Sequence, residues 1–208
     1  MRRLIKVGLT GGIATGKSMT LEQWKKSGAA GIDADDLAHR AIEPQTPAWH
    51  EVVKTFGEGI LNEDRTVNRR KLGDIVFADE RKRTVLNGII HPVVERMWTE
   101  EVEKLTRVGE VEMVVVTVPL LYEVAAETRV DCVVVVGCSE QTQLTRLAAK
   151  GFTEPQARAR IGAQWPLATK MDRADFVIWN DGGLRALTEQ AGMIWANIKE
   201  SYHASNKN

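Results

Sequence analysis

The sequence lacks an excess of charge of either sign. Its 208 residues include 28 Lys and Arg and 28 Asp and Glu, so the formal net charge at pH 7 is zero. A neutral chain creates no long-range field that would attract nucleic acid or an anionic membrane, and we expect neither as a partner. Any anion must therefore be held by a local site. With 43% apolar and 27% charged residues, the chain can form an ordinary globular core.

Long apolar runs and cysteines are also scarce. No run reaches the roughly 18 residues of a membrane span, and the apolar stretch near the N-terminus is too short for a signal peptide. The two cysteines, Cys132 and Cys138, fall in or beside one predicted strand. Along an extended strand they would be roughly 20 Å apart, whereas a disulfide needs less than about 7 Å. We therefore expect a cytoplasmic protein without a disulfide.

Strand-like runs alternate with helical patterns along the chain. Two of these runs, Val111–Val118 and Cys132–Val136, do not alternate between apolar and polar residues, which is typical of strands covered on both faces of a parallel sheet. The sequence therefore predicts an α/β fold with a five-stranded parallel sheet flanked by helices. The predicted strands are Leu4–Thr10, Ala29–Ile32, Val111–Val118, Cys132–Val136 and Phe176–Trp179.

Two long helical segments interrupt this alternation. Residues 34–108 lie between the second and third strands, and residues 139–174 between the fourth and fifth, the latter with one helical pattern from Glu140 to about Ala163. Insertions of this kind usually carry function on a rigid scaffold. We predict a single domain over residues 1–208. Its core would be 1–33, 109–138 and 175–202, with a substrate-binding helical insertion at 34–108 and a lid at 139–174.

A glycine-rich segment joins the first strand to the first helix. Residues 11–18, GGIATGKS, match the phosphate-loop pattern G-x-x-x-x-G-K-[ST]. Glycines let the backbone curl so that N–H groups and the positive end of the next helix face one anion. Lys17 would reach the β and γ phosphates, and the Ser18 hydroxyl would bind Mg²⁺. The predicted phosphate-site residues are Gly11, Gly12, Ile13, Ala14, Thr15, Gly16, Lys17, Ser18 and Met19.

Several classes of phosphate-loop protein fit poorly. Thr169–Asp172 matches the guanine-specificity pattern [NT]-K-x-D, but the residues before it do not form a strand, which argues against a GTPase. Motor and transporter ATPases usually end a core strand with a carboxylate, whereas the third predicted strand runs into Pro119. Only Asp33 places an acid at a strand end. There it could accept the proton of an attacking hydroxyl, which suits a small-molecule kinase. The other interpretation is a helix N-cap, a role we expect of Asp35 rather than Asp33.

The order of the motifs resembles that of the dephospho-coenzyme A kinase family over nearly the whole chain. Each motif is short, but the series is specific. It comprises Gly8–Ile13, Ile32–Asp35, Phe56-Gly57, Arg69–Phe77, His91-Pro92, Pro119–Glu123, Gln143–Leu147, Arg160-Ile161 with Gln164, and Ala174-Asp175 leading to Asn180.

This resemblance implies transfer of the ATP γ-phosphoryl group to the ribose 3′-hydroxyl of dephospho-coenzyme A, with Mg²⁺ as cofactor. Asp33 matches the family's catalytic aspartate, and we expect Lys17 and Arg146 to act beside it. The alternatives are another phosphate-loop kinase of nucleotides or nucleosides, and a non-catalytic nucleotide-sensing module. We expect a monomer or small homo-oligomer. Further candidates are Asn180 for the nucleotide, and Asp35, Arg69 and His91 for the substrate.

A few positions depart from the family pattern or allow two interpretations. Ala14 and Thr15 stand where the family usually has Gly-Ser, and we expect Ala14 to be tolerated only at a negative φ. His91-Pro92 either begins a helix or contacts substrate. Lys150 shares a helix face with Arg146 but replaces a common Arg, so its role in the lid stays open.

Overall fold

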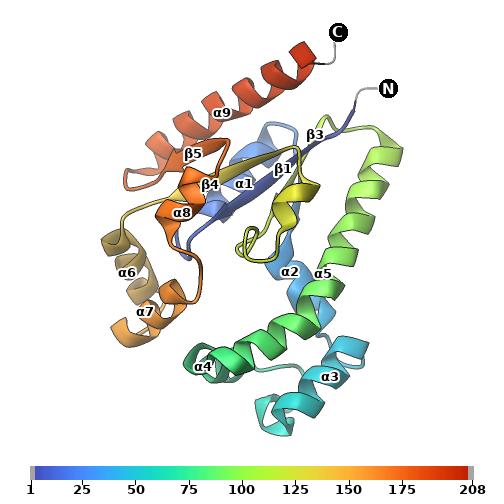
Figure 1. The fold of residues 1–208 in the computed structure, drawn as a ribbon, viewed down its shortest axis with the longest axis vertical. Coiled ribbons are helices and arrows are strands. Elements are labelled where there is room, and N and C mark those ends of the chain that lie inside the picture. The colour runs from blue at the N-terminus through green and yellow to red at the C-terminus, as the bar shows by residue number, and fades with distance from the viewer. Residues whose placement is uncertain (1–2, 206–208) are drawn as a thin grey trace. The chain divides into compact units, whose positions relative to one another are not determined.

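The fold is an α/β structure built on one parallel sheet. The computed structural model describes residues 3–205 and has five strands there in the order β2-β3-β1-β4-β5 (Figure 1). The predicted parallel sheet is confirmed. The strands are β1 (Ile5–Gly11), β2 (Ala30–Asp33), β3 (Met113–Thr117), β4 (Cys132–Gly137) and β5 (Phe176–Trp179).

The central strand β1 carries the phosphate loop at its carboxyl end. It pairs in parallel with β3, from Ile5 opposite Met113 to Leu9 opposite Thr117. On its other side it pairs with β4, where Gly11 lies opposite Val136. Ligands of open parallel sheets bind outside the carboxyl ends of the strands, so this register places the loop where such sites form.

The chain divides into two compact units. One contains the residues up to Ile32 and those from Val102 onward, and the other is Asp33–Glu101. The boundaries that we predicted for the insertion and the lid stay a prediction, and the ends of the predicted domain lie outside the described residues.

In the first unit, helices α1 (Lys17–Lys26) and α9 (Leu184–Ser205) cover one face of the sheet. Figure 1 shows α9 beside β5. The core on this face includes Leu9 of β1, Trp24 of α1 and Leu187 of α9, and the Trp24 indole N–H donates to the Ala191 carbonyl at 2.8 Å. On the other face α8 (Leu167–Asp172) packs against Val133 and Val135 of β4.

The predicted helix over residues 140–163 is wrong as a single element. It forms two helices, α6 (Glu140–Ala149) and α7 (Glu154–Gly162). Gly151 has φ +83° and ends the first, while Thr153 begins the second with a capping box to Gln156. A residue in the left-handed region and a new N-cap are the two signals that end one helix and start another.

The unit Asp33–Glu101 is helical. It holds α2 (Ala34–Ala41), α3 (Pro47–Phe56), the short helix η1 (Glu58–Ile60), α4 (Arg69–Ala78) and most of α5 (Glu80–Val108). Trp49 and Val52 of α3 pack with Leu72 and Val76 of α4 in its core.

His91-Pro92 does not begin a helix, so this interpretation is wrong. Pro92 lies inside α5. The start signal is Asp79, whose carboxylate accepts from the N–H groups of Arg81 and Lys82 at 2.9 and 3.2 Å. An aspartate that accepts these bonds is a strong N-terminal signal, and tertiary packing overrides the proline further along.

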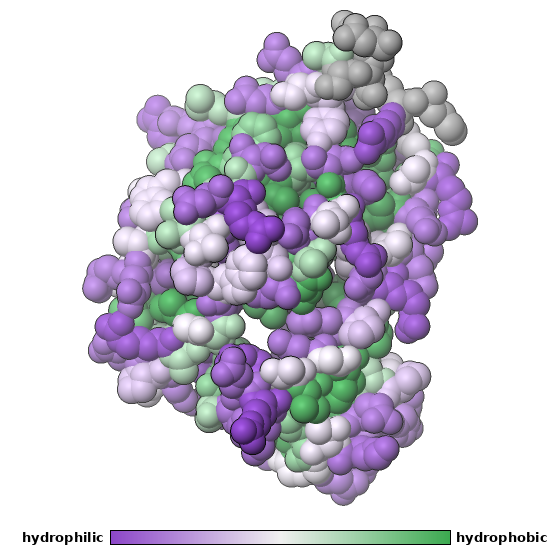
Figure 2. Space-filling view, in the orientation of Figure 1, coloured by the Kyte–Doolittle hydropathy of each residue, from purple (hydrophilic) through white to green (hydrophobic). Residues whose placement is uncertain are grey.

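The two cysteines are free, as predicted, Cys132 within β4 and Cys138 just beyond it. Figure 2 shows apolar groups interspersed among hydrophilic side chains over the face in view. Within residues 3–205 no helix combines the length and the apolar content needed to cross a membrane.

Candidate active site

The phosphate loop connects β1 directly to α1. Gly11 has φ +144° and Gly16 has φ +115°, a region that L side chains rarely adopt. A Cβ on Gly11 would overlap the Val136 carbonyl oxygen, and one on Gly16 would overlap the Asn180 amide. Both glycines of the motif are therefore required by backbone conformation and by close approach.

The expectation of a negative φ at Ala14 is wrong. Ala14 has φ +59°, in the left-handed region. For an L residue this conformation costs roughly 1–2 kcal/mol, so surrounding contacts must maintain it. Alanine lacks the β-branching that would make this region less accessible still.

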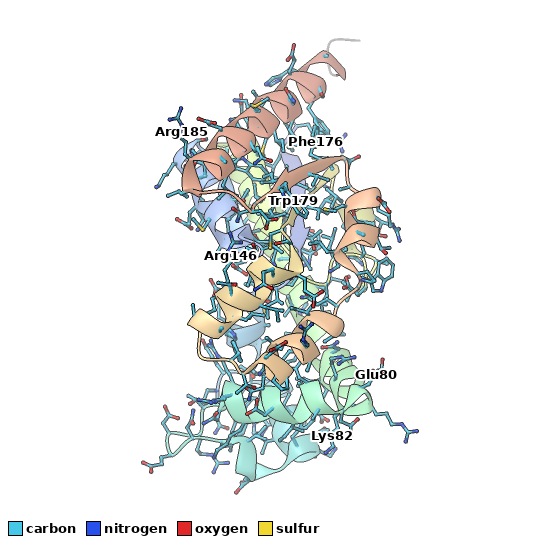
Figure 3. All side chains as sticks on the ribbon, turned by 90° about the vertical axis from the view of Figure 1, so that its left-hand side faces the viewer. Glu80, Lys82, Arg146, Phe176, Trp179 and Arg185 are labelled. Atoms are coloured by element: carbon cyan, nitrogen blue, oxygen red, sulfur yellow. The ribbon has the colours of Figure 1, made fainter. Side chains whose placement is uncertain are left out.

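Side chains from elsewhere in the chain donate hydrogen bonds to the carbonyl groups of the loop. Arg146 of α6 donates through Nη1 to the carbonyls of Ala14 (3.1 Å) and Thr15 (3.2 Å). Through Nη2 it donates to the Asn180 carbonyl at 2.9 Å, and Asn180 Nδ2 donates to the Thr15 carbonyl at 2.7 Å. Figure 3 labels Arg146 on α6, below Trp179 at the end of β5. The guanidinium thus binds the outside of the loop, and a direct role in phosphoryl transfer stays a prediction.

Two glutamines that we had not singled out as site residues contact the same loop. Gln143 Nε2 donates to the Ile13 carbonyl at 2.8 Å, and Gln164 Oε1 accepts from the Ile13 N–H at 2.9 Å. Both lie within family motifs, which was the available signal. Their partners are two backbone groups of Ile13, which no side-chain pattern reveals.

The lysine and the hydroxyls of the motif lie at the start of α1. Lys17 Nζ donates to the carbonyls of Gly12 (2.8 Å) and Gly11 (3.2 Å). Its ammonium thus lies over the glycine turn of its own loop. Ser18 and Met19 are exposed in the first turn of α1, while Thr15 is buried and donates to the Gly12 carbonyl at 2.9 Å. The positive end of α1 and the Lys17 ammonium together make this turn an anion site.

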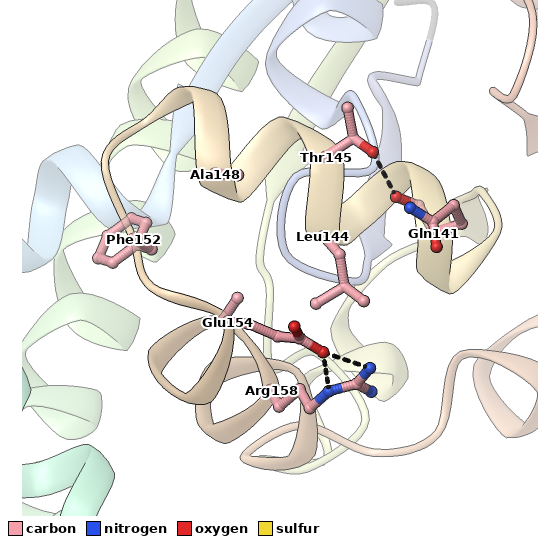
Figure 4. A pocket seen from close by; sticks show the side chains of 8 residues that line it. Gln141, Leu144, Thr145, Ala148, Phe152, Glu154 and Arg158 are labelled. Atoms are coloured by element: carbon pink, nitrogen blue, oxygen red, sulfur yellow. Dashed lines mark hydrogen bonds and ion pairs between the residues drawn. The ribbon is translucent and has the colours of Figure 1, made fainter.

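A hollow between α6 and α7 is a different feature. It has a volume of about 390 Å³, and Figure 4 shows Leu144, Ala148 and Phe152 around it. Residues 141, 144, 145 and 148 lie on the opposite side of α6 from Gln143 and Arg146, because successive helix residues turn by about 100°. The hollow therefore opens away from the face of α6 that contacts the loop.

The GTPase-like stretch Thr169–Asp172 lies in helix α8, not at a strand end, which confirms the argument against a GTPase. Lys170 is fully buried there and donates to the Pro119 carbonyl and to Glu123, each at 2.8 Å. Burial lowers the pKa of Lys170 from its usual value, while its bond to Glu123 opposes that shift. This lysine connects α8 to the loop after β3 and cannot read a guanine base.

The family model and the relatives found by sequence indicate one family. The sequence model of dephospho-CoA kinase matches residues 5–186. The chain belongs to the dephospho-CoA kinase family. Members of this family are ATP-dependent kinases that catalyse the final step of coenzyme A biosynthesis.

Individual relatives support this assignment. A dephospho-CoA kinase of Geobacillus kaustophilus is 46% identical over 86% of this chain and 89% of its own length. One of Bacillus licheniformis is 42% identical over 93% of this chain and 98% of its own. The crystal structure of TT1252 from Thermus thermophilus has a TM-score of 0.77 at 31% identity, covering 95% of this chain and 98% of that one.

In this dephospho-CoA kinase family member, Asp33 caps helix α2. Its Oδ1 accepts from the Asp35 N–H at 2.9 Å. The expectation that Asp35 would be the cap is wrong, because the helix begins at Ala34 and places Asp35 in its first turn. Asp33 is half-buried and Asp35 is exposed. The cap contact uses Oδ1 of Asp33, and its catalytic role stays a prediction.

Three predicted residues of the same unit lie around His39, a residue we had not singled out. Burial lowers the pKa of His39 and the charge of Arg69 lowers it further, while the carboxylates of Asp35 and Asp33 oppose the shift. Asp33, Asp35 and Arg69 are therefore within electrostatic reach of one side chain. For His91, burial alone lowers the pKa. That Asp35, Arg69 and His91 bind substrate stays a prediction.

Substitution of Ala14 tests the strained loop. Ala14→Gly should leave ADP affinity within about twofold of wild type, because glycine adopts a positive φ freely. Ala14→Val should weaken ADP binding by about tenfold or more, because a β-branched residue is a genuine outlier there. Titration calorimetry measures both affinities. If the valine variant bound ADP as tightly as wild type, the left-handed conformation would not be the one that binds nucleotide.

Proposed function

We propose that this chain transfers the γ-phosphoryl group of ATP to the ribose 3′-hydroxyl of dephospho-coenzyme A, with Mg²⁺ and in the cytoplasm. The observation that carries the proposal is the phosphate loop, whose backbone is held open at the carboxyl end of the sheet. The family match supports the choice of acceptor, and the loop supports the choice of donor.

The loop would bind the β and γ phosphates of ATP. Fixing the carbonyls of Ile13 and Thr15 on one side turns the N–H groups of Ala14 and Gly16 to the other, because each trans peptide points its C=O and N–H in opposite directions. Lys17 would leave its loop carbonyls for the phosphate oxygens, a stronger, charge-assisted partner. No reorganisation of the backbone would then be needed when the charge shifts during transfer.

The residues at the start of α1 fit a Mg²⁺ ion. Ser18 offers an exposed hydroxyl, and a second hydroxyl lies at the end of the neighbouring strand. Thr117 Oγ1 is buried, and within residues 3–205 it has no hydrogen-bond partner. Strand alternation places Thr117 on the face of Met113 and Val115, which α1 covers. When bound, the ion would neutralise phosphate charge, with Ser18 as ligand and Thr117 bonding its water shell.

Asp33 would act as the general base for the acceptor hydroxyl. Its carboxylate would take the proton of the 3′-hydroxyl as that oxygen bonds to the γ phosphorus, while the bond to the β-phosphate oxygen breaks and ADP leaves. Its position at the end of β2 and its match to the family's aspartate support this role. The transition state is largely a matter of position and charge, so the base contributes a modest share of the rate.

A substrate panel tests the proposed function. We expect ADP release from ATP with dephospho-coenzyme A, and far slower release with AMP, CMP or uridine. Detection of coenzyme A by mass spectrometry identifies the product. A preference for CMP or uridine would replace the proposal with a nucleotide or nucleoside kinase, and nucleotide binding without transfer to any acceptor would replace it with a sensing module.

The variant Asp33→Asn separates catalysis from helix capping. Asparagine caps helices about as well as aspartate, so the melting temperature should stay at the wild-type value. The kcat should fall by about 10²- to 10⁴-fold, because the proton acceptor is lost. Lys17→Ala, which should abolish turnover by removing the cation of the loop, is the reference for full loss. Unchanged kcat and melting temperature together would restrict Asp33 to capping.

Thr117→Val tests the metal site without a turnover assay. The variant should bind ADP normally in EDTA but lose several-fold of the affinity that Mg²⁺ adds. Thr117→Ser, which keeps the hydroxyl, should retain that gain. Folding should not suffer, because replacing an unpaired buried hydroxyl by a group of the same shape removes a desolvation cost. If the valine variant kept the full Mg²⁺ effect, Thr117 would have no part in binding the metal.

A further inference from the structure

One residue of the phosphate loop, Ile13, has both of its backbone groups bound from separate segments. The N–H of Ile13 donates to Gln164, which lies between α7 and α8, and the C=O of Ile13 accepts from Gln143 in α6. Both glutamines belong to the stretch 139–174, and the loop lies about 130 and 150 residues earlier in the chain. The two bonds therefore join the loop to two separate parts of this stretch, helix α6 and the connection between α7 and α8.

The polarity of these bonds is fixed by the backbone. An N–H can only donate and a C=O can only accept, so Gln143 must present its amide nitrogen and Gln164 its amide oxygen. Gln143 is 4% exposed. A buried amide of this kind is costly to leave without a partner, which makes its bond to Ile13 an energetic constraint rather than a surface contact.

Gln143 binds the peptide group that adjoins the strained residue, and Gln164 binds the peptide group before it. Gln143 fixes the carbonyl of Ile13, and that carbonyl sets the plane of the peptide that carries the Ala14 N–H. Arg146 fixes the following carbonyl, that of Ala14. The left-handed conformation of Ala14 is thus bounded by a hydrogen bond on each side.

We propose that Gln143 and Gln164 are positioning residues for the nucleotide, which hold the two peptide groups on either side of the Ile13 Cα so that the phosphate loop is open before ATP arrives. They also couple the stretch 139–174 to the nucleotide site. The inference rests on the proposed function only in that the loop binds a nucleotide. It needs no assumption about the acceptor.

The opposite polarities allow a matched test. Gln164→Glu keeps an oxygen that accepts the Ile13 N–H, whereas Gln143→Glu replaces a donor by an oxygen facing the Ile13 carbonyl. Both variants add one negative charge beside the backbone of the same residue, Ile13, so their common electrostatic effect on ADP cancels in the comparison. We expect ADP to bind the Gln143→Glu variant about tenfold or more weakly than the Gln164→Glu variant. Equal affinities would overturn the proposal.

Neutral variants and a control on the same helix complete the test. Gln143→Met and Gln164→Met should each weaken ADP and pyrophosphate binding several-fold. The Gln141 side chain lies on the opposite side of α6 from Gln143. The Gln141→Glu variant should therefore bind ADP with wild-type affinity. In the Gln164→Met variant the Ile13 amide should exchange faster by NMR. Methionine variants that lowered the melting temperature but left ADP affinity unchanged would show a purely structural role and refute the positioning role.

These measurements stand apart from the proposed function. Normal ADP binding with the predicted variant pattern, but no transfer to dephospho-coenzyme A, would refute the proposed function and leave this inference intact. If the protein transferred phosphate to dephospho-coenzyme A but the glutamine variants left ADP affinity unchanged, the positioning role would be refuted and the proposed function would stand.

Discussion

The site depends on how the carbonyl groups of the phosphate loop are bound. A loop that offers its N–H groups to an anion must turn its C=O groups the other way, and these need donors. Side chains of Gln143, Arg146 and Asn180 supply them for Ile13, Ala14 and Thr15. Because these donors come from α6 and from the residue after β5, the anion site exists only when the sheet and the stretch 139–174 are assembled together.

Much of this architecture could be predicted from the sequence. Continuous apolar runs identified the buried parallel strands, and the glycine-lysine pattern identified the loop, because both depend on local residue types. The register of β1 between β3 and β4 then brings Gly11 opposite Val136, so close that only glycine fits. A local sequence pattern is sufficient to predict a site where the backbone geometry allows only one residue type.

The features that the sequence did not predict depend on long-range contacts. The φ of Ala14 reflects bonds to residues about 130 positions away, and no local preference of alanine favours that conformation. The capping role of Asp33 rather than Asp35 depends on where β2 ends. Pro92 lies inside α5 although proline usually marks a helix start, because packing of the surrounding helix outweighs the lost bond.

If the side-chain donors hold the loop carbonyls, the phosphate loop is already ordered without nucleotide. Backbone ¹⁵N relaxation of the nucleotide-free protein measures this directly at Ile13, Ala14 and Gly16. We predict order parameters near 0.85, the value of a rigid backbone, that change little when ADP binds. Order parameters below about 0.6 without nucleotide, rising on ADP binding, would show that the nucleotide itself orders the loop and would contradict preorganisation by Gln143, Arg146 and Asn180.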